Sequence, residues 1–270
     1  MAGGILIRVR DLVARYGDFL VLDGVDLDVF DGEILVIMGG SGCGKSTLLR
    51  HMIGLEAPHS GTVVVDGTDI QGCSDTEFNQ MRRKIGVLFQ GAALFGSMTV
   101  AQNVAVALDA YSGLPRDAIE RLVGIKLKVV GLHGYENHLP SELSGGMKKR
   151  AGLARALAMN PKILFLDEPS AGLDPVTSAE IDELILHINR STGTTMIIIT
   201  HELASVFTLA SRVVMLDKRA RGIIAEGDPR RLRETSRNAF VRQFFNRQAH
   251  PVHETTQQPV KSQQLTRGGA

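Results

Sequence analysis

The 270-residue sequence has no tryptophan and only two cysteines, Cys43 and Cys73. Two cysteines give no disulfide framework, which favours a reducing compartment such as the cytosol. Long hydrophobic runs are also missing, because "ILVIM" and "MIII" are far shorter than the ~20 residues that span a bilayer. The amino terminus lacks the apolar core of a signal peptide. We therefore expect a chain that does not cross a membrane by itself.

An excess of charge of one sign is absent as well. The 30 Lys and Arg residues nearly balance the 29 Asp and Glu residues, so the formal net charge is +1. Nothing in this balance marks a nucleic-acid binder, and we expect no nucleic-acid partner. Hydrophobic residues (44%) and charged residues (22%) are typical of a globular protein of one large domain, with or without a subdomain.

Short apolar runs alternate with helix patterns along most of the chain. The runs lack polar alternation, which is typical of parallel strands that helices cover on both faces. They are "ILVIM", "KIGVLFQ", "KILFLDEP" and "TTMIIITHE". Helical segments lie between them, and this order predicts an α/β fold. Further strands are expected in residues 5–38, in a pair around residues 63–70, and in "RVVMLDKRARGIIAEG".

The region 97–141 differs, because it carries helix patterns and little strand signal. We interpret it as a helical subdomain, extending over about 97–160, inserted before the next core strand. A short helix is expected to begin near Pro229. The polar sequence from His250 predicts disorder. The expected organisation is one folded domain, 5–245, and a disordered tail, 246–270.

A glycine-rich loop follows the first buried run. Gly39, Gly44, Lys45 and Ser46 satisfy the pattern G-x-x-x-x-G-K-[ST] between a strand signal and a helix signal. In such loops, backbone N–H groups and the helix amino terminus surround phosphate oxygens. Lys45 can neutralise phosphate charge, and the Ser46 hydroxyl can bind Mg²⁺. The loop therefore predicts nucleotide binding.

Three other buried runs end in polar residues, where open α/β sheets place their ligands. Asp167 would hold Mg²⁺ directly or through water, and Glu168 would orient and polarise the attacking water. Gln90 offers a neutral ligand for Mg²⁺ or water, and His201 could donate a hydrogen bond to the γ-phosphate. A lone glutamine or histidine is more often structural, so these two predictions depend on convergence of the strand ends.

The stretch "LSGGM" begins another helix. Ser144 is a good amino-terminal cap, and Gly145 and Gly146 expose backbone N–H groups. This is a second phosphate-binding device. Spacing alone does not say whose phosphate it binds.

Over about residues 5–245, these motifs resemble the nucleotide-binding subunits of ATP-binding-cassette (ABC) transporters. "GGSGCGKST" is similar to their Walker A loop, "FQ" to the Q-loop, "LSGGM" to the signature, "ILFLDE" to Walker B, "SAGLD" to the D-loop and "TH" to the switch histidine. The resemblance implies an ABC-type P-loop NTPase fold with a parallel core sheet, an antiparallel β subdomain and the inserted helical subdomain.

The resemblance also implies ATP and Mg²⁺ as cofactors and a head-to-tail dimer with two ATP molecules at its interface. Ser144, Gly145, Gly146 and Met147 would then act on the ATP of the second copy, and Asp174 would join the two sites. Glu168, His201 and Gln90 would be catalytic, and Ser46, Gln90 and Asp167 would bind the metal. The expected ATP-binding residues are Tyr16, which would stack on adenine, and Gly39, Gly40, Ser41, Gly42, Cys43, Gly44, Lys45, Ser46 and Thr47.

A finer resemblance is to the ATPases of MCE-type lipid transporters, particularly the maintenance-of-lipid-asymmetry systems. It is carried by "FQGAALFGSMTVAQNV" and "LSGGMKKRAGLARAL", where Met147 replaces a common glutamine. It implies phospholipid transport between the inner and outer membranes, through transmembrane permease subunits with MCE-domain and STAS-domain partners. The protein would lie on the cytoplasmic face of the inner membrane, and residues 91–104 would receive a coupling helix of the permease.

Three other functions remain open. The same motor could serve an importer of amino acids or other small solutes. A soluble cassette protein acting on DNA or ribosomes is less favoured, because the chain has one cassette and no long coiled-coil insertion between Gly39 and Ser144. A P-loop kinase or GTPase would have no role for "LSGG".

Some side chains outside the motifs have more than one interpretation. The apolar face of Phe240, Val241, Phe244 and Phe245 packs on its own domain or on a partner. Residues 81–84 and 148–150 are expected to be solvated helix faces, although the latter could sit near phosphate. Cys43 occupies a variable loop position, where alkylation would hinder ATP binding by bulk.

Overall fold

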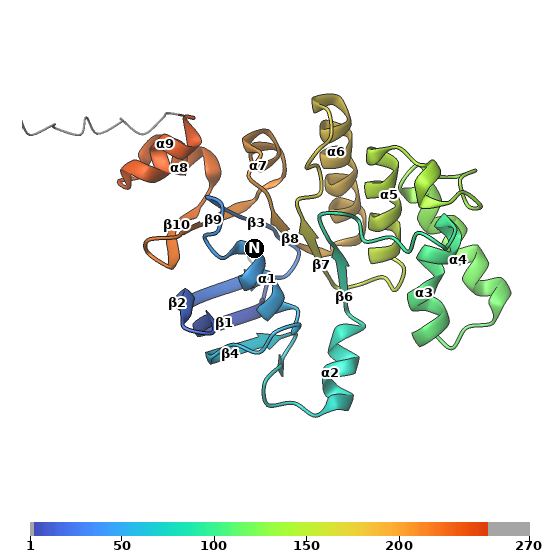
Figure 1. Cartoon of the computed structure of the whole chain (residues 1–270), viewed down its shortest axis with the longest axis horizontal. Helices are drawn as coiled ribbons and strands as arrows, with labels where there is room; N and C mark the ends of the chain where they lie inside the picture. Colours follow the sequence, from blue (N-terminus) through green and yellow to red (C-terminus); the bar gives the residue numbers. More distant parts are fainter. Residues whose placement is uncertain (1–2, 248–270) are drawn as a thin grey trace, which may run out of the picture.

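The computed structural model describes residues 3–247 and contains two sheets with helices around them (Figure 1). The larger sheet has the strand order β10-β9-β3-β8-β7-β6. The strands β9, β3, β8, β7 and β6 are parallel, and β10 pairs with β9 in the antiparallel sense. Their bounds are β3 (Ile34–Gly39), β6 (Ile85–Leu88), β7 (Ile163–Asp167), β8 (Thr195–Ile199), β9 (Arg212–Asp217) and β10 (Gly222–Gly227).

The four apolar runs of the sequence are thus adjacent strands of one parallel sheet, as predicted. Their burial explains the lack of polar alternation: every residue of β3 and of β8 is buried. Successive side chains still point to opposite faces, so Val36 and Met38 join one core cluster and Leu35 and Ile37 the other.

The smaller sheet is antiparallel, with the order β2-β1-β4-β5. It is made of β1 (Ile5–Tyr16), β2 (Phe19–Phe30), β4 (Ser60–Val65) and β5 (Thr68–Asp69). Its apolar side chains share one core cluster with Leu35 and Ile37 of the larger sheet and with Leu48 and Met52 of α1 (Lys45–Met52). One face of the parallel sheet is therefore covered by a second sheet and a helix.

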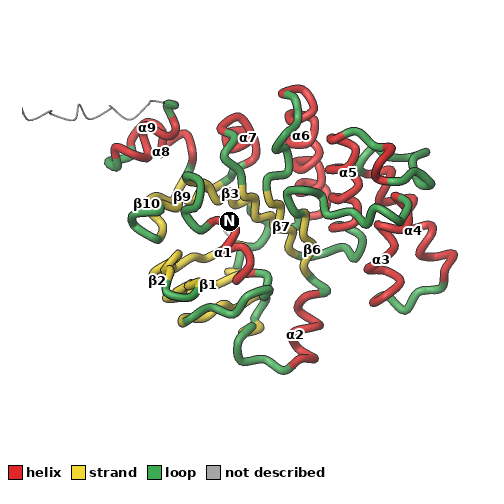
Figure 2. The backbone as a smooth tube through the Cα atoms, viewed as in Figure 1, coloured by secondary structure: helices red, strands yellow, loops and turns green. Residues whose placement is uncertain are grey.

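The opposite face is covered by helices, which lie above the sheet in Figure 1. The helices between β6 and β7 gather at one end, as Figure 2 shows, and confirm the helical pattern of that region. They are α3 (Val100–Tyr111), α4 (Arg116–Val129), the short 3-10 helix η1 (Pro140–Glu142) and α5 (Gly145–Ala156), and they are followed after β7 by α6 (Pro175–Thr192) and α7 (Leu203–Leu209).

The helix α7 was not expected, α2 (Asp75–Arg82) begins earlier than the expected helix face 81–84, and one surface expectation is wrong. The helix α2 begins with a capping box, in which Ser74 and Glu77 satisfy each other's backbone N–H groups. The expected solvated face 81–84 fails at Met81, which is 1% exposed and packs into the core under the antiparallel sheet. The helix α7 has only seven residues, too few for a clear period.

Two helices close the described chain, α8 (Pro229–Thr235), which begins at the expected proline, and α9 (Ala239–Phe245). Val241 and Phe245 are buried in the core of their own chain, and the ring of Phe245 lies 5.8 Å from that of Phe207 on α7. Packing on its own domain is therefore confirmed for this part of the apolar face. Most of the expected disordered tail, 248–270, lies outside the described residues.

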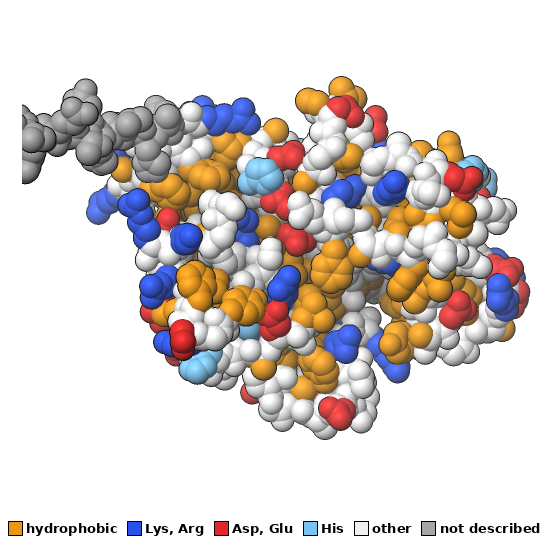
Figure 3. Space-filling view, in the orientation of Figure 1, with side chains coloured by type: hydrophobic (Ala, Val, Ile, Leu, Met, Phe, Trp, Pro, Cys, Tyr) orange, Lys and Arg blue, Asp and Glu red, His pale blue; other side chains and the backbone are white. Residues whose placement is uncertain are grey.

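Charged side chains of both signs are interspersed on the face shown in Figure 3, in keeping with the nearly balanced formal charge. None of the helices within residues 3–247 combines the length and the apolar character that a bilayer crossing requires.

Candidate functional site

The glycine-rich loop connects β3 to α1, and its glycines are required by space as well as by backbone angle. Gly39 has φ +145°, and a Cβ there would lie 2.3 Å from the carbonyl oxygen of Leu216. Gly44 has φ +99°, and a Cβ there would lie 2.6 Å from Cδ2 of Leu22. Any larger residue would push the loop away from the sheet. The loop can therefore bring its backbone close to a ligand.

Lys45 lies across this loop. Its Nζ donates hydrogen bonds to the carbonyl oxygens of Gly39 and Gly40, both at 3.0 Å. Ser41, Gly42 and Ser46 are exposed at the same place, and Ser46 stands in the first turn of α1. A cradle of main chain, one ammonium group and a helix amino terminus suits a polyphosphate.

Cys43 does not lie where its loop position suggested. Its side chain is 1% exposed, and burial raises the pKa of the thiol. The sulfur packs inward, 3.9 Å from Nζ of Lys45, so Cys43 contributes main chain to the loop surface. A reagent must therefore open the loop before it reaches the thiol, and the expectation that alkylation hinders ATP binding by bulk stays a prediction.

Glu168 follows the last residue of β7 and is held from several sides. Its backbone is left-handed (φ +50°), and its N–H donates to the carbonyl of Ile199 at 2.9 Å. Its Oε1 lies 2.7 Å from Nδ1 of His201, whereas Oε2 is buried and has no partner among the described residues. The structure thus brings together the predicted base and the predicted switch histidine. This second carboxylate oxygen therefore lacks a hydrogen-bond donor, and it could accept a proton from a water molecule that enters the site.

Asp167, the last residue of β7, is partly buried. Burial raises the pKa of its carboxyl, and the charge of Glu168 adds to this, whereas the charges of Lys149 and Lys45 oppose it. A cation beside Asp167 would favour its ionised form.

The described residues contain no cluster of three or more histidine, cysteine or acidic side chains suited to a metal. This donor set still fits Mg²⁺, which is commonly bound by one or two carboxylates together with substrate phosphates and water. The carboxylate of Asp167 and the hydroxyl of Ser46 are the side chains that would supply oxygen ligands, with Gln90 as the amide.

Gln90 is exposed just beyond β6. Its main chain is connected to the site by Lys149, a residue that was not predicted from the sequence. Lys149 is only 7% exposed, and its Nζ donates to the carbonyl oxygens of Gln90 at 2.5 Å and of Glu168 at 2.7 Å. The expected solvated face 148–150 is therefore wrong at Lys149. The signal that could have found it is its three-residue spacing from Gly146 and Gly152 on a buried helix face.

The signature residues begin α5 as predicted. Ser144 is the cap and accepts a hydrogen bond from the N–H of Met147 at 3.3 Å. Gly145 is exposed, and Gly146 is buried where a Cβ would lie 2.6 Å from Cγ2 of Thr177 on α6. Close packing of α5 on α6 therefore requires glycine at 146, and it leaves the first turn of α5 open to a ligand.

Asp174 caps α6 and accepts hydrogen bonds from the N–H groups of Val176 and Thr177 and from the hydroxyl of Thr177. The bond from Thr177 lowers the pKa of this carboxyl. Within one chain, Asp174 has the role of a helix cap.

Tyr16 ends β1 with 46% of its surface exposed. Its hydroxyl donates to Oε2 of Glu56 at 2.7 Å, which lowers the pKa of Glu56. Arg50 of α1 pairs with the other oxygen of Glu56 at 3.1 Å. The exposed ring is thereby held beside the helix that begins at Lys45, where stacking on adenine stays a prediction.

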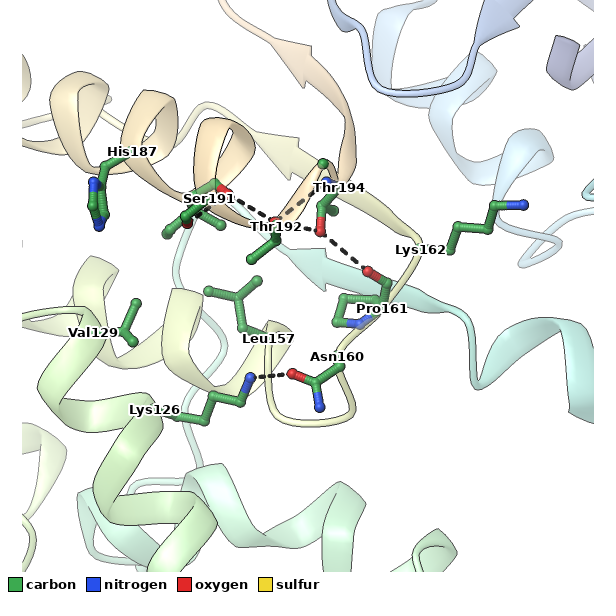
Figure 4. Close-up of a pocket in the computed structure, with 12 residues that line it drawn as sticks. Lys126, Val129, Leu157, Asn160, Pro161, Lys162, His187, Ser191, Thr192 and Thr194 are labelled. Atoms are coloured by element: carbon green, nitrogen blue, oxygen red, sulfur yellow. Dashed lines mark hydrogen bonds between the residues drawn. The ribbon is translucent and has the colours of Figure 1, made fainter. Parts of the chain in front are cut away.

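A separate cavity of about 340 Å³ lies at the other ends of the strands, before β7 and β8 (Figure 4). Its lining includes Lys126, Val129, Leu157 and Thr194, and Nζ of Lys126 donates to Oδ1 of Asn160. None of the predicted site residues lines it. We therefore assign the chemistry to the carboxyl ends of the strands and not to this cavity.

The chain is similar to ATP-binding proteins of transporters. Residues 22–171 match the family described as "ABC transporter". The chain is 42% identical over 246 residues to the "Probable ribonucleotide transport ATP-binding protein mkl" of Mycobacterium leprae (strain TN), covering 91% of this chain and 70% of that protein. It is 40% identical over 224 residues to the "Methionine import ATP-binding protein MetN" of Brucella abortus (strain 2308), covering 83% and 60%.

Two solved structures are also similar. The protein cbiO1 from Clostridium perfringens, described as part of the ABC transporter complex cbiONQ, superposes with a TM-score of 0.76 at 34% identity, covering 84% of this chain and 89% of that one. The ATP-binding cassette MJ0796, in a dimeric post-hydrolysis state bound to ADP and Pi, superposes with a TM-score of 0.75 at 30% identity, covering 82% and 98%. The predicted ABC-type P-loop NTPase fold is confirmed.

Proposed function

The chain belongs to the ABC transporter family as an ATP-hydrolysing subunit, and we propose that it powers phospholipid transport between the inner and outer membranes through partner membrane subunits. The observation that carries the motor function is the meeting of the glycine-rich loop, Asp167 and the Glu168–His201 pair. They stand at the carboxyl ends of β3, β7 and β8, which are adjacent parallel strands.

In this proposal each site residue has a distinct task. The loop 39–47 and Tyr16 bind ATP. Ser46, Asp167 and Gln90 hold Mg²⁺, which would neutralise charge on the phosphates when bound. Glu168 orients the attacking water, and His201 keeps that carboxylate in place and contacts the γ-phosphate. The buried and unpartnered Oε2 of Glu168 supports its role as proton acceptor.

The working unit is a dimer with two shared sites. Ser144 and Gly145 are exposed at the amino terminus of α5, so they are available to the ATP of a second copy. Gly146 and Met147 complete that turn, and Asp174 connects the two sites. MJ0796, which is similar in fold, is described as dimeric. The domain of this proposal is 5–245, with a helical subdomain at about 97–160.

The permease would dock on residues 91–104. Asn103 is fully buried, accepts a hydrogen bond from the N–H of Phe95 at 2.8 Å, and donates to the carbonyl of Met98 at 3.1 Å. These bonds fix the turn before α3, while the ring of Phe95 stays 49% exposed. A cavity of about 760 Å³ between α3 and α4 adjoins the turn. A rigid turn with an exposed aromatic ring beside a cavity suits a partner helix.

The phospholipid cargo rests on the likeness of "FQGAALFGSMTVAQNV" and of the signature with Met147 to ATPases of MCE-type systems. Permease, MCE-domain and STAS-domain subunits would be the partners, on the cytoplasmic face of the inner membrane. Import of a small solute is the second candidate. It is favoured by relatives named for ribonucleotide transport and for methionine import.

Purification of the tagged full chain from native membranes tests the proposal. Recovery of a permease with an MCE-domain subunit and a small STAS-type protein is expected. A periplasmic solute-binding protein in their place would overturn the phospholipid cargo. Phe95→Asp should release the permease and leave ATP affinity unchanged. Ile125→Asp is the matched control, because Ile125 is 56% exposed on α4 and does not line that cavity.

A further inference from the structure

Lys149 occupies an unusual place for a lysine. It stands in the second turn of α5 and is 7% exposed, and its Nζ faces two main-chain oxygens. These oxygens belong to Gln90, beyond β6, and to Glu168, beyond β7, which are far apart in the sequence. A buried ammonium group is costly unless hydrogen bonds replace its water. The two carbonyls provide that replacement, so the side chain has one well-defined position.

The bond to Glu168 acts on a residue whose main chain is otherwise unusual. A glutamate at φ +50° is strained and persists only if its surroundings hold it. Its N–H is held by Ile199 of β8, and its carbonyl is held by Lys149 at 2.7 Å. The main chain on both sides of Cα is therefore fixed. The direction of the carboxylate towards His201 depends on both anchors.

The bond to Gln90 is one of several contacts between α5 and the segment after β6. Arg155, six residues later on α5, donates to the carbonyls of Ala92 at 2.8 Å and Ala93 at 2.7 Å. A Cβ at Gly152 would lie 2.7 Å from Cδ1 of Leu88. These contacts hold the segment firmly against α5. Of the residues that make them, Lys149 also bonds to Glu168, which follows β7.

The charge of Lys149 also belongs to the site. Burial lowers the pKa of its ammonium group, and the negative charges of Glu168, Asp167 and Glu202 oppose that effect. An apolar side chain of the same length would leave the two carbonyls without a donor, a loss that a purely apolar packing role would not involve.

We propose that Lys149 is a positioning residue for ATP hydrolysis, which holds Gln90 and Glu168 to the helix that carries the signature. In this role it sets where the carboxylate of Glu168 stands relative to the attacking water. The inference rests on the proposed function of Glu168 as the group that orients this water.

Steady-state hydrolysis by the full chain with ATP and Mg²⁺ provides the first test. Lys149→Met should lower kcat by about 10- to 100-fold, the usual cost of removing a supporting hydrogen-bond partner. KM and nucleotide affinity should change less than about threefold, because the phosphate loop is untouched. Lys149→Arg should recover most of kcat, since a guanidinium group can donate to two carbonyls. Lys148→Met, which removes the same charge one residue away, should retain full turnover.

A double-mutant cycle separates positioning from a general structural role. If Lys149 acts through Glu168, Lys149→Met should not slow the residual hydrolysis of Glu168→Gln any further. Losses that multiply in the double variant, or a kcat of Lys149→Met within about twofold of the parent, would overturn the inference. If Lys149→Met does not fold, Lys149→Gln replaces it, because its shorter amide cannot reach both carbonyls.

The same experiment distinguishes the two proposals. Full turnover by Glu168→Gln alone would remove the proposed function of Glu168. Loss of turnover in Glu168→Gln together with normal Lys149→Met would remove only the positioning role.

Discussion

Asp182 provides a quantitative test of the packing between α6 and α7. Its carboxyl is 4% exposed, and Oδ1 has no hydrogen-bond partner among the described residues. Burial raises the pKa to about 6, the Ser205 hydroxyl opposes the rise, and the charges of Glu202 and Glu183 add to it. A cavity of about 590 Å³ that His201 also lines adjoins this carboxyl.

The sign and size of the effect on stability follow from this pKa. The ordinary pKa of 3.8 applies in the unfolded chain, whereas the folded protein holds the proton up to about pH 6. Ionisation of Asp182 therefore does not lower the free energy of unfolding below pH 3.8. The loss grows as the pH rises and is complete above pH 6. Slightly more than two pKa units at 1.36 kcal/mol each correspond to about 3 kcal/mol of lost unfolding free energy.

The change to make is Asp182→Asn, which removes the ionisation and keeps the shape. The variant should gain stability relative to the parent as the pH rises, by about 1.4 kcal/mol between pH 5 and pH 8. Urea unfolding at several pH values, followed by circular dichroism, measures this gain.

Only the pH-dependent part of the difference in unfolding free energy reports on the ionisation of Asp182. A change in packing would shift this difference by the same amount at every pH. Glu183→Gln is the control. It removes the same charge from the exposed neighbouring residue and should stay within about 0.5 kcal/mol of the parent at every pH. A difference between Asp182→Asn and the parent that does not vary with pH would show that this carboxyl titrates normally, and the burial argument would fail.

Three further results are expected at the nucleotide site. Lys45→Ala should abolish ATP binding in a fluorescent-nucleotide titration, and near-normal affinity would remove the phosphate-loop assignment. Glu168→Gln should slow phosphate release by orders of magnitude while ATP binding persists and the dimer accumulates in size-exclusion chromatography; full turnover would contradict its role. Because Cys43 is 1% exposed with a raised thiol pKa, alkylation by a maleimide should be slow and should be slowed further by ATP, as mass spectrometry would measure. Rapid modification would contradict the buried position.

Much of the site could be predicted because it depends on strand ends. A run of apolar residues that stops at Asp167 or at His201 predicts the strand, and it also predicts that a polar residue stands at the carboxyl end of that strand. Parallel pairing then brings those ends to one edge of the sheet. The order of the strands was the missing step, and the structure supplied it.

The failed prediction at Lys149 has a physical cause. Lysine is usually exposed, and its burial here follows from which neighbours the fold brings near. For Lys149 these neighbours are two carbonyls just beyond β6 and β7, which are adjacent in the sheet but far apart in the sequence, so no local pattern reveals them. The capping box of Ser74 and Glu77, by contrast, has the sequence pattern S-x-x-E and could have predicted where α2 begins.

The position of Lys149 on α5 has a consequence for how two copies would work together. Ser144 caps the same helix five residues earlier, about 7.5 Å along its axis at 1.5 Å per residue. Hydrogen-bonded helices are stiff over that distance, so a phosphate that bound and shifted Ser144 would also move Nζ of Lys149. Lys149 would pass that movement to the main chain of Glu168 in the same subunit. Binding of one ATP by the signature of this chain would thereby adjust the base that acts on the other ATP. Hydrolysis at the two sites of the dimer should then be cooperative, and Lys149→Met should reduce the Hill coefficient towards one.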